Sequence, residues 1–514
     1  MMRSESPPRA EARQWLGLAV LALPLLVLAL DVSVLYLAAP ALTADLRPSA
    51  TQQLWILDVY GFLIAGFLVT MGSVGDRIGR RRLLLTGGAT FAVASVVAAY
   101  APTAETLILA RALLGIAGAT LMPSTLALIS TMFRDPAQRT TAIAVWMTTF
   151  SAGVALGPIV GGLLLANFWW GSVFLLGVPV MLLLLVLGPV LLPEHRDPAG
   201  VRGVDVLSIA LSLAAMLPLA YGVKETAAHG PAVVPALAVV AGLGAGWAFV
   251  RRQRRMADPM LDVALFTRRE FVAAVSLILL GLLALNGLFY LLPQFLQLVS
   301  GADALQAGLW MLPVAAATVV GSLLTPPLAR RVGRTRLLAV AAAVSLLGCV
   351  AITRVDADVS PAVLVGLLAV TILGVVPTGV LGTDLVVGSV PPERAGSASA
   401  VSETAGELGV ALGVAAAGSV VTAVYGARLA DELPAGVPVE AVAAAQEGLA
   451  PALVSAQSLP GPVGVGLAEA ARTAFTVAFG AVGWYGAAVL ALVVVLTLTV
   501  LRERPAPPSS CPAK

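Results

Sequence analysis

The chain has 514 residues, of which 59% are apolar and 11% are charged, and its net charge is +3. Soluble domains carry roughly 25% charged and 45–50% apolar residues, so this composition excludes a soluble enzyme, a disordered scaffold and a nucleic-acid binder. A membrane-spanning helix needs roughly 20 apolar residues. The composition therefore predicts an all-α polytopic membrane protein with short loops.

Cysteine and histidine are scarce, with only Cys349, Cys511, His195 and His229 in the chain. None of them has the spacing of a zinc site or of a Cys/His nucleophile, so we expect no metal, no cofactor and no enzymatic activity. The sequence also contains no G-x-x-x-x-G-K-[ST] loop for nucleotide phosphates. An ion gradient is therefore the predicted energy source.

Apolar runs separated by short polar breaks predict fourteen transmembrane helices. They fall into two groups of six, with a pair between them and tails at both ends. In chain order the predicted parts are a tail 1–14, a six-helix bundle 15–192, an inserted pair 204–250, a basic loop 251–270, a second six-helix bundle 271–501 with a long loop 426–472, and a tail 502–514.

The charges of alternate loops support this topology. Of the 31 Lys and Arg residues, 25 fall on the side of the N-terminus, five fall on the other side, and Arg111 lies within a span. The positive-inside rule then places both termini in the cytoplasm. The most basic segment, 251–270, is expected at the cytoplasmic surface against anionic lipid, and the loop 426–472 is expected outside.

An internal repeat relates the two predicted bundles. The segments GDRIGRRRLLL at 75–85 and ARRVGRTRLLA at 329–339 share R-x-G-R-x-R-L-L at an offset of 254 residues. Repeated helix bundles are common in transporters, so the inserted pair is predicted to lie between two related halves. The second copy has Arg330 where the first has Asp76, and only the first copy is predicted to be complete.

Several segments resemble motifs of the major facilitator superfamily. These are Gly72 to Leu84 (motif A), Arg111 to Ala119 (motif B), Gly153 to Gly162 (motif C) and Leu30 to Pro40 (a first-span motif). The pattern is most similar to the fourteen-span drug:proton antiporter branch, with its Qac/Smv/Lfr-type multidrug efflux pumps. Those pumps expel quaternary ammonium compounds, dyes and some fluoroquinolones.

The resemblance implies the major facilitator fold and export driven by protons across a bacterial cytoplasmic membrane. The partners it implies are lipophilic cations, protons and membrane lipid, with no nucleic acid, for a protein that acts as a monomer. Two alternatives stay open: a dedicated exporter of one antibiotic or metabolite, and a proton-coupled importer. The motif C segment argues against the importer.

The candidate charged residues within the apolar runs are Asp31, Asp58, Arg111, Glu403 and Glu407. Each costs roughly 2.5–3.5 kcal/mol at the centre of a membrane helix, so a transport pathway or proton relay is the default interpretation. Asp31 and Arg111 fall at similar depth, and the alternative for them is a structural ion pair. By resemblance, Asp31 is the acid that couples protons and recognises cations, and Arg111 is its partner.

The other acids have functional and structural interpretations. Asp58 beside Tyr60 can contact a cation, with cation–π attraction from the ring, or can reach lipid headgroups at the interface. Glu403 and Glu407 are spaced i, i+4 and share a helix face, which suits a proton site or a bound cation. Glu403 can instead lie at the membrane interface.

Motif A has its core at Gly72, Asp76, Arg77, Gly79 and Arg80. The aspartate can lie at a helix N-terminus and the arginines can bridge the cytoplasmic face. By resemblance this segment is a conformational latch between the halves, and the alternative is plain positive-inside charge.

Motif C contains Gly153, Gly157 and Gly161, which fall four apart on one helix face, with Pro158 and Gly162 beside them. Small residues at this spacing let another helix approach closely, and proline kinks a helix. A packing hinge is therefore predicted.

Overall fold

The structure is a computed structural model that describes residues 10–48, 50–194, 205–229, 232–256, 259, 261, 263–302, 304–391, 395–434 and 436–500. Regular structure in these ranges is entirely helical, as the composition predicts. The predicted tail 502–514 lies outside the described residues, as do residues 1–9 of the first tail, His195 and Cys511.

In the first half of the chain, the described residues form nine α-helices. They are α1 (Ala12–Leu46), α2 (Ala50–Ile78), α3 (Arg80–Ala99), α4 (Ala104–Met132), α5 (Pro136–Asn167), α6 (Ser172–Leu175), α7 (Gly177–Leu191), α8 (Val206–His229) and α9 (Val233–Gln253). A 3₁₀ turn, η1 (Val263–Thr267), follows them and leads into the second half.

The second half begins with α10 (Arg269–Gln294) and a π-helical turn, η2 (Phe295–Val299). The remaining helices are α11 (Ala304–Val332), α12 (Arg334–Ile352), α13 (Pro361–Gly388), α14 (Ala395–Glu432), α15 (Val439–Gln446), α16 (Leu449–Ser458) and α17 (Gly461–Val500).

Local chemistry determines where several helices begin. Thr103 accepts a hydrogen bond from the backbone N–H of Thr106 at the start of α4. Asp135 caps α5 with proline at the first helical position, and Ser360 caps α13 in the same way. Oxygen side chains at this position satisfy backbone N–H groups that have no partner within the helix, and proline there sacrifices no hydrogen bond.

Eleven segments of the described chain are long and apolar enough to cross a membrane. They are the first part of α1 (Ala12–Asp31), α3, α4, α6 with α7, α9, α10 with η2, most of α11, and α12, α13, α14 and α17. The protein is thus a multi-pass membrane protein.

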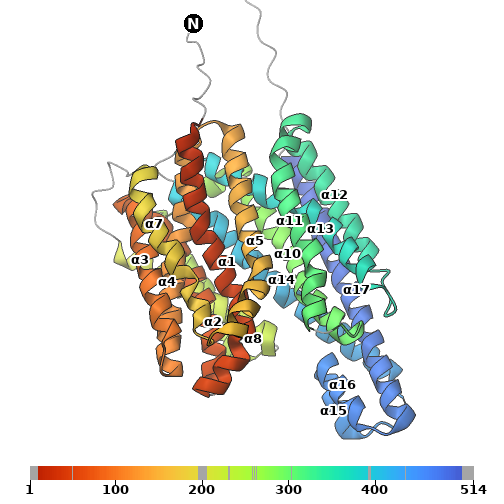
Figure 1. Ribbon diagram of the computed structural model, residues 1–514. Helices are drawn as coiled ribbons and strands as arrows, with labels where there is room; N and C mark the ends of the chain where they lie inside the picture. The colour runs from red at the N-terminus through yellow and green to blue at the C-terminus, as the bar shows by residue number, and fades with distance from the viewer. Residues whose placement is uncertain are drawn as a thin grey trace, which may run out of the picture.

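The helices pack into two groups, with α1 to α7 on one side and α10 to α17 on the other (Figure 1). In the first group α1 packs on α5, while α4 packs on both α2 and α3; in the second, α10 packs on α14 and α13 lies between α11 and α12. The groups meet where α14 contacts α2 and α4, and where α5 contacts α11 and α13. Helices α8 and α9 pack on each other, and α8 contacts both α2 and α14.

Helices fill most of the segment 426–472, which the sequence predicts as a loop between spans. Helix α14 continues to Glu432 and α17 begins at Gly461, so much of the predicted loop 426–472 is helix, and α15 and α16 form a small helical hairpin in the rest. Alanine is abundant there, and it has the highest helix propensity. The membrane-length segment Ser172–Leu191 is divided at Leu176 into α6 and α7, since Pro179 has no N–H to donate to the carbonyl of Leu175.

Glycine sets the distance between α2 and α4. A Cβ atom added to Gly115 of α4 would lie 2.6 Å from the backbone oxygen of Tyr60 in α2, so the two backbones are nearly in contact. Arg111 lies one turn before Gly115 and therefore on the same face of α4. This close approach brings Arg111 against α2.

We expect Gly115→Ala to destabilise the protein by about 1–3 kcal/mol, since the added methyl group overpacks the α2–α4 contact. The matched control is Gly366→Ala in α13, because nothing lies within 4 Å of the added Cβ there. Thermal unfolding of the purified variants measures the difference. Equal melting temperatures for the two variants would contradict the packing argument.

Candidate functional site

The centre of the candidate site is an ion pair between α1 and α4. Arg111 Nη1 donates to Asp31 Oδ2 at 2.5 Å, and Arg111 Nε donates to the backbone oxygen of Ile56 at 3.2 Å. The Arg111 side chain is 1% exposed and that of Asp31 is 9% exposed. The residues that the sequence placed at similar depth are therefore direct partners.

Tyr60 completes this group from α2. The Arg111 guanidinium lies 4.4 Å from the centre of the Tyr60 ring, which is the geometry of a cation–π contact. The Tyr60 hydroxyl is buried and has no hydrogen-bond partner among the described residues. Asp31, Arg111 and Tyr60, from three helices, therefore combine a negative group, a positive group and an aromatic face.

The second group of helices reaches this site through α14. Glu407 interacts electrostatically with Tyr60, and Glu403 with Glu407. Both glutamates are half-buried on α14, one helical turn apart. The predicted acids Asp31 and Glu407 thus lie near the same tyrosine, on opposite sides of the contact between the two helix groups. The side chain of Asp58 lies outside the described residues.

Motif C packs against the helix that carries Asp31. A Cβ added to Gly153 of α5 would lie 2.6 Å from the Cβ of Ala29 in α1. Gly157 and Gly161 are buried and Gly162 is half-buried, whereas the side chain of Pro158 lies outside the described residues. The close approach at Gly153 therefore packs α5 against α1 two residues before Asp31.

Motif A joins the two helix groups where α2 passes into α3. Asp76 accepts hydrogen bonds from the backbone N–H groups of Gly396 at 3.1 Å and Ser397 at 2.9 Å, at the first turn of α14. Arg80 Nε donates to the same carboxylate at 3.0 Å, and the arginine is 1% exposed. A carboxylate at a helix N-terminus is stabilised by the helix dipole, so Asp76 fastens α2 to α14.

The neighbouring motif A residues have geometric roles. Gly72 lies against α14, because an added Cβ would come 2.6 Å from the backbone oxygen of Gly396. Gly79 has a φ of 107°, which side chains rarely adopt, and precedes the first residue of α3. Arg77 is half-buried on the last turn of α2.

A second polar cluster, centred on Asp384, lies at the same end of the bundle as motif A. It was not predicted from the sequence. Asp384 of α13 is fully buried and accepts from Arg139 Nε at 2.7 Å and Thr140 Oγ1 at 3.0 Å, both on α5. Arg334, the first residue of α12, lies 3.0 Å from Asp384 Oδ2, the oxygen that also accepts from Thr140. Arg330 of α11 donates to Thr141 Oγ1 at 2.9 Å. This cluster also ties the two helix groups together.

The repeat explains the position of the second cluster. The offset of 254 residues relates Arg80 to Arg334, and Ser130 of α4 to Asp384 of α13. Both arginines bind a buried acid, and Gly333, like Gly79, has a positive φ of 87°. The second copy has no acid at position 330, as the sequence shows, and Asp384 of α13 lies against its arginine instead. One signal could have found it: Asp384 is the only charged residue in the apolar run 361–388.

A bundle of long apolar helices with ionised groups buried between them is the architecture of a membrane transporter and not of an enzyme. The family model of the Major Facilitator Superfamily matches residues 21–414. The chain belongs to this superfamily, as the sequence motifs predicted.

Characterised relatives support this assignment. The chain is 46% identical to the multidrug efflux pump LfrA of Mycolicibacterium smegmatis over 91% of this chain and 93% of that protein. It is 34% identical to the methyl viologen resistance protein SmvA of Salmonella typhimurium over 90% and 93%. It is 30% identical to the tetracenomycin C resistance and export protein of Streptomyces glaucescens over 91% and 88%.

A solved structure has the same fold. The human organic anion transporter MFSD10 superposes with a TM-score of 0.60 at 17% identity, covering 95% of this chain and all of that one.

Asp31→Asn is expected to lower the stability of the protein by about 3–5 kcal/mol, because it leaves the charge of Arg111 buried without a partner. The double variant Asp31→Asn/Arg111→Met should recover much of this loss. Thermal unfolding in detergent measures both, with the exposed Asp356→Asn as the control. Unchanged stability in Asp31→Asn would show that the pair is not energetically coupled.

The two polar clusters should open independently. Asp76→Ala removes the acceptor of the Gly396 and Ser397 amides, so hydrogen exchange there should accelerate roughly tenfold or more. Asp384→Ala should leave that turn unchanged and accelerate exchange at the start of α5. Mass spectrometry of deuterated peptides resolves the two regions, and each variant is the control for the other. Identical exchange patterns would contradict independence.

Proposed function

We propose that the protein is a proton-coupled antiporter that exports lipophilic, cationic drugs. It is a drug exporter of the same kind as LfrA and SmvA, to which it is similar along almost its whole length. The observation that carries the proposal is the buried Asp31–Arg111 pair under the ring of Tyr60, with Glu407 nearby. Such a group holds one carboxylate that a proton or an organic cation can neutralise.

The mechanism follows from competition for Asp31. A lipophilic cation that enters the site gains attraction from the carboxylate and from the Tyr60 ring. A proton on Asp31 removes that attraction and weakens the bond to Arg111. The cation is then released, and deprotonation restores the pair. In this proposal Glu403, Glu407 and Asp58 add negative charge for substrate or proton.

Alternating access requires the bundle to open at each end in turn. We assign the end where α2 passes into α3 to the cytoplasm, following the positive charge of its loops. The Asp76 and Asp384 clusters both join the helix groups at that end. They are then the latches that hold the cytoplasmic side closed, and both must break before a drug can enter from the cytoplasm.

We also infer fourteen spans with both termini in the cytoplasm. Eleven segments qualify by length and apolarity, and α2, α5 and α8 have 29, 32 and 24 residues. At roughly 1.5 Å per residue each of these three is long enough for a hydrocarbon core of roughly 30 Å. Helices α1 to α7 and α10 to α17 then form two six-span bundles, with α8 and α9 inserted.

A dedicated antibiotic exporter is the second candidate. The tetracenomycin C resistance and export protein is 30% identical over 91% of the chain, so the same architecture serves one antibiotic in that relative. An exporter of many drugs and an exporter of a single antibiotic would both contain the Asp31–Arg111 pair. Only a transport assay with several substrates separates them.

We expect the wild type, reconstituted in proteoliposomes with a pH gradient, to transport ethidium, and Asp31→Asn to lose gradient-driven transport by roughly a hundredfold or more. The loss follows because the variant has no carboxylate for either the proton or the cation. Asp356→Asn removes an exposed acid far from the pair in sequence and should transport like the wild type.

Ethidium transport by Asp31→Asn at the wild-type rate would contradict the role of Asp31. A folded wild type that ignores ethidium but moves one natural antibiotic would favour the dedicated exporter.

A further inference from the structure

Helix α9 exposes a continuous apolar stripe. Val233, Leu237, Val240 and Trp247 recur every three to seven residues and are between 62% and 74% exposed. This spacing keeps them on one face of the helix. In a membrane protein such a face meets the acyl chains of lipids, so α9 has a lipid-facing side along most of its length.

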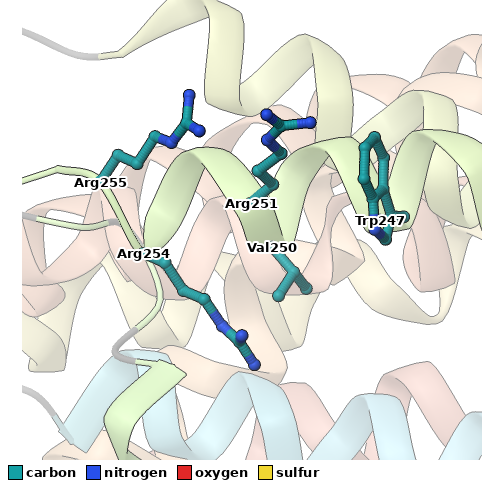
Figure 2. Close-up of a pocket in the computed structure, with 5 residues that line it drawn as sticks. All are labelled: Trp247, Val250, Arg251, Arg254 and Arg255. Carbon is teal, nitrogen blue, oxygen red and sulfur yellow. The ribbon is translucent and has the colours of Figure 1, made fainter.

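The stripe ends in arginines. Arg251 follows Trp247 by one turn on the same face of α9. Arg255 lies in the turn just after the end of the helix and continues this row of side chains, which we call the ladder. The Arg251 guanidinium lies 5.2 Å from the Trp247 ring. Figure 2 shows Arg251 and Arg255 extending to the same side of α9, with Arg254 on the other side. Together with Val250 they line a hollow of about 290 Å³.

A separate contact fixes the position of this ladder. Arg252 binds Asp205, just before α8, at 3.0 and 3.1 Å, and Gln253 donates to Ser208 at 2.7 Å. Burial opposes ionisation of Asp205, but hydrogen bonds from Ser208 and Arg252 outweigh it and lower its pKa to about 2. The carboxylate therefore stays charged at physiological pH. Arg252 faces α8, whereas Arg251, Arg254 and Arg255 are exposed.

We propose that the C-terminal end of α9 binds the phosphate headgroup of an anionic phospholipid, with Arg251 and Arg255 on the phosphate and the acyl chains along the stripe that includes Trp247. Two guanidinium groups suit phosphate oxygens, because each presents several N–H donors. The apolar stripe that continues from the arginines favours a lipid over free phosphate. Tryptophan is enriched at the depth where acyl chain meets headgroup.

Helix α8 connects the helix that carries this site to both helix groups. Helix α9 packs on α8, and α8 contacts α2 in one group and α14 in the other. These are the helices that the Asp76 latch joins. A lipid bound at the end of α9 therefore lies against the pair of helices that bridges the moving parts.

The test is lipid retention by the full chain, purified from vesicles of phosphatidylcholine with phosphatidylglycerol and measured by native mass spectrometry. We expect the wild type to retain phosphatidylglycerol over phosphatidylcholine, and Arg251→Gln/Arg255→Gln to lose roughly tenfold of this preference. The control is Arg331→Gln/Arg336→Gln, which removes two exposed arginines from the repeat segment at the same end of the bundle. It should keep the wild-type preference.

A second measurement tests the proposal if the variant Arg251→Gln/Arg255→Gln does not fold. Phosphatidylglycerol with brominated acyl chains should quench the tryptophan fluorescence of the wild type more than brominated phosphatidylcholine does, and Trp247→Phe should lose the difference. Equal lipid preference in both arginine variants would overturn the proposal. So would displacement of the lipid by millimolar inorganic phosphate, which would identify a free-phosphate site instead.

Discussion

The whole structure depends on one constraint: a charge buried in an apolar bundle must have a partner. Arg111 meets it with Asp31 and the Tyr60 ring, Arg80 with Asp76, and Asp384 with Arg139 and Arg334. Breaking such a pair strands a buried charge and costs several kcal/mol. In a transporter, a proton or a cation that replaces one partner of such a pair can shift the equilibrium between two packings of the same helices.

The two helix groups are joined at two acids, and these acids differ in their hydrogen-bond donors. Asp76 is held largely by backbone N–H groups of α14, and Asp384 by side chains of α5 and α12. The contacts of Asp76 with α14 and of Asp384 with α5 cross from one helix group to the other, so these contacts must break when the bundle opens at that end. Both copies of the repeat therefore have the arginine and a glycine with positive φ. The acid lies on α2 in the first half and on α13 in the second.

Much of this was predictable from the sequence. Composition indicates the helical membrane class, and the motifs indicate the superfamily. The positions of Asp31 and Arg111 in their apolar runs placed them at similar depth, because helix rise is constant, and the family resemblance named them as partners. Asp384 had a local signal as the one charged residue in its apolar run, but its partner on α5, Arg139, is 245 residues away and no local pattern links the two. The helices within 426–472 were not predicted for another reason: an alanine-rich segment between spans is compatible with either a loop or a helix.

The donors of the Asp76 latch have a consequence for evolution. Every residue except proline supplies a backbone N–H, so exchanges at Ser397 leave that donor in place, while Gly396 has no room for a Cβ because Asp76 lies against it. The Asp384 contacts depend on the identity of Arg139 and Arg334, which can change together with it. Among relatives of this protein, covariation should therefore link positions 139, 334 and 384, whereas position 76 should vary with none of its partners on α14.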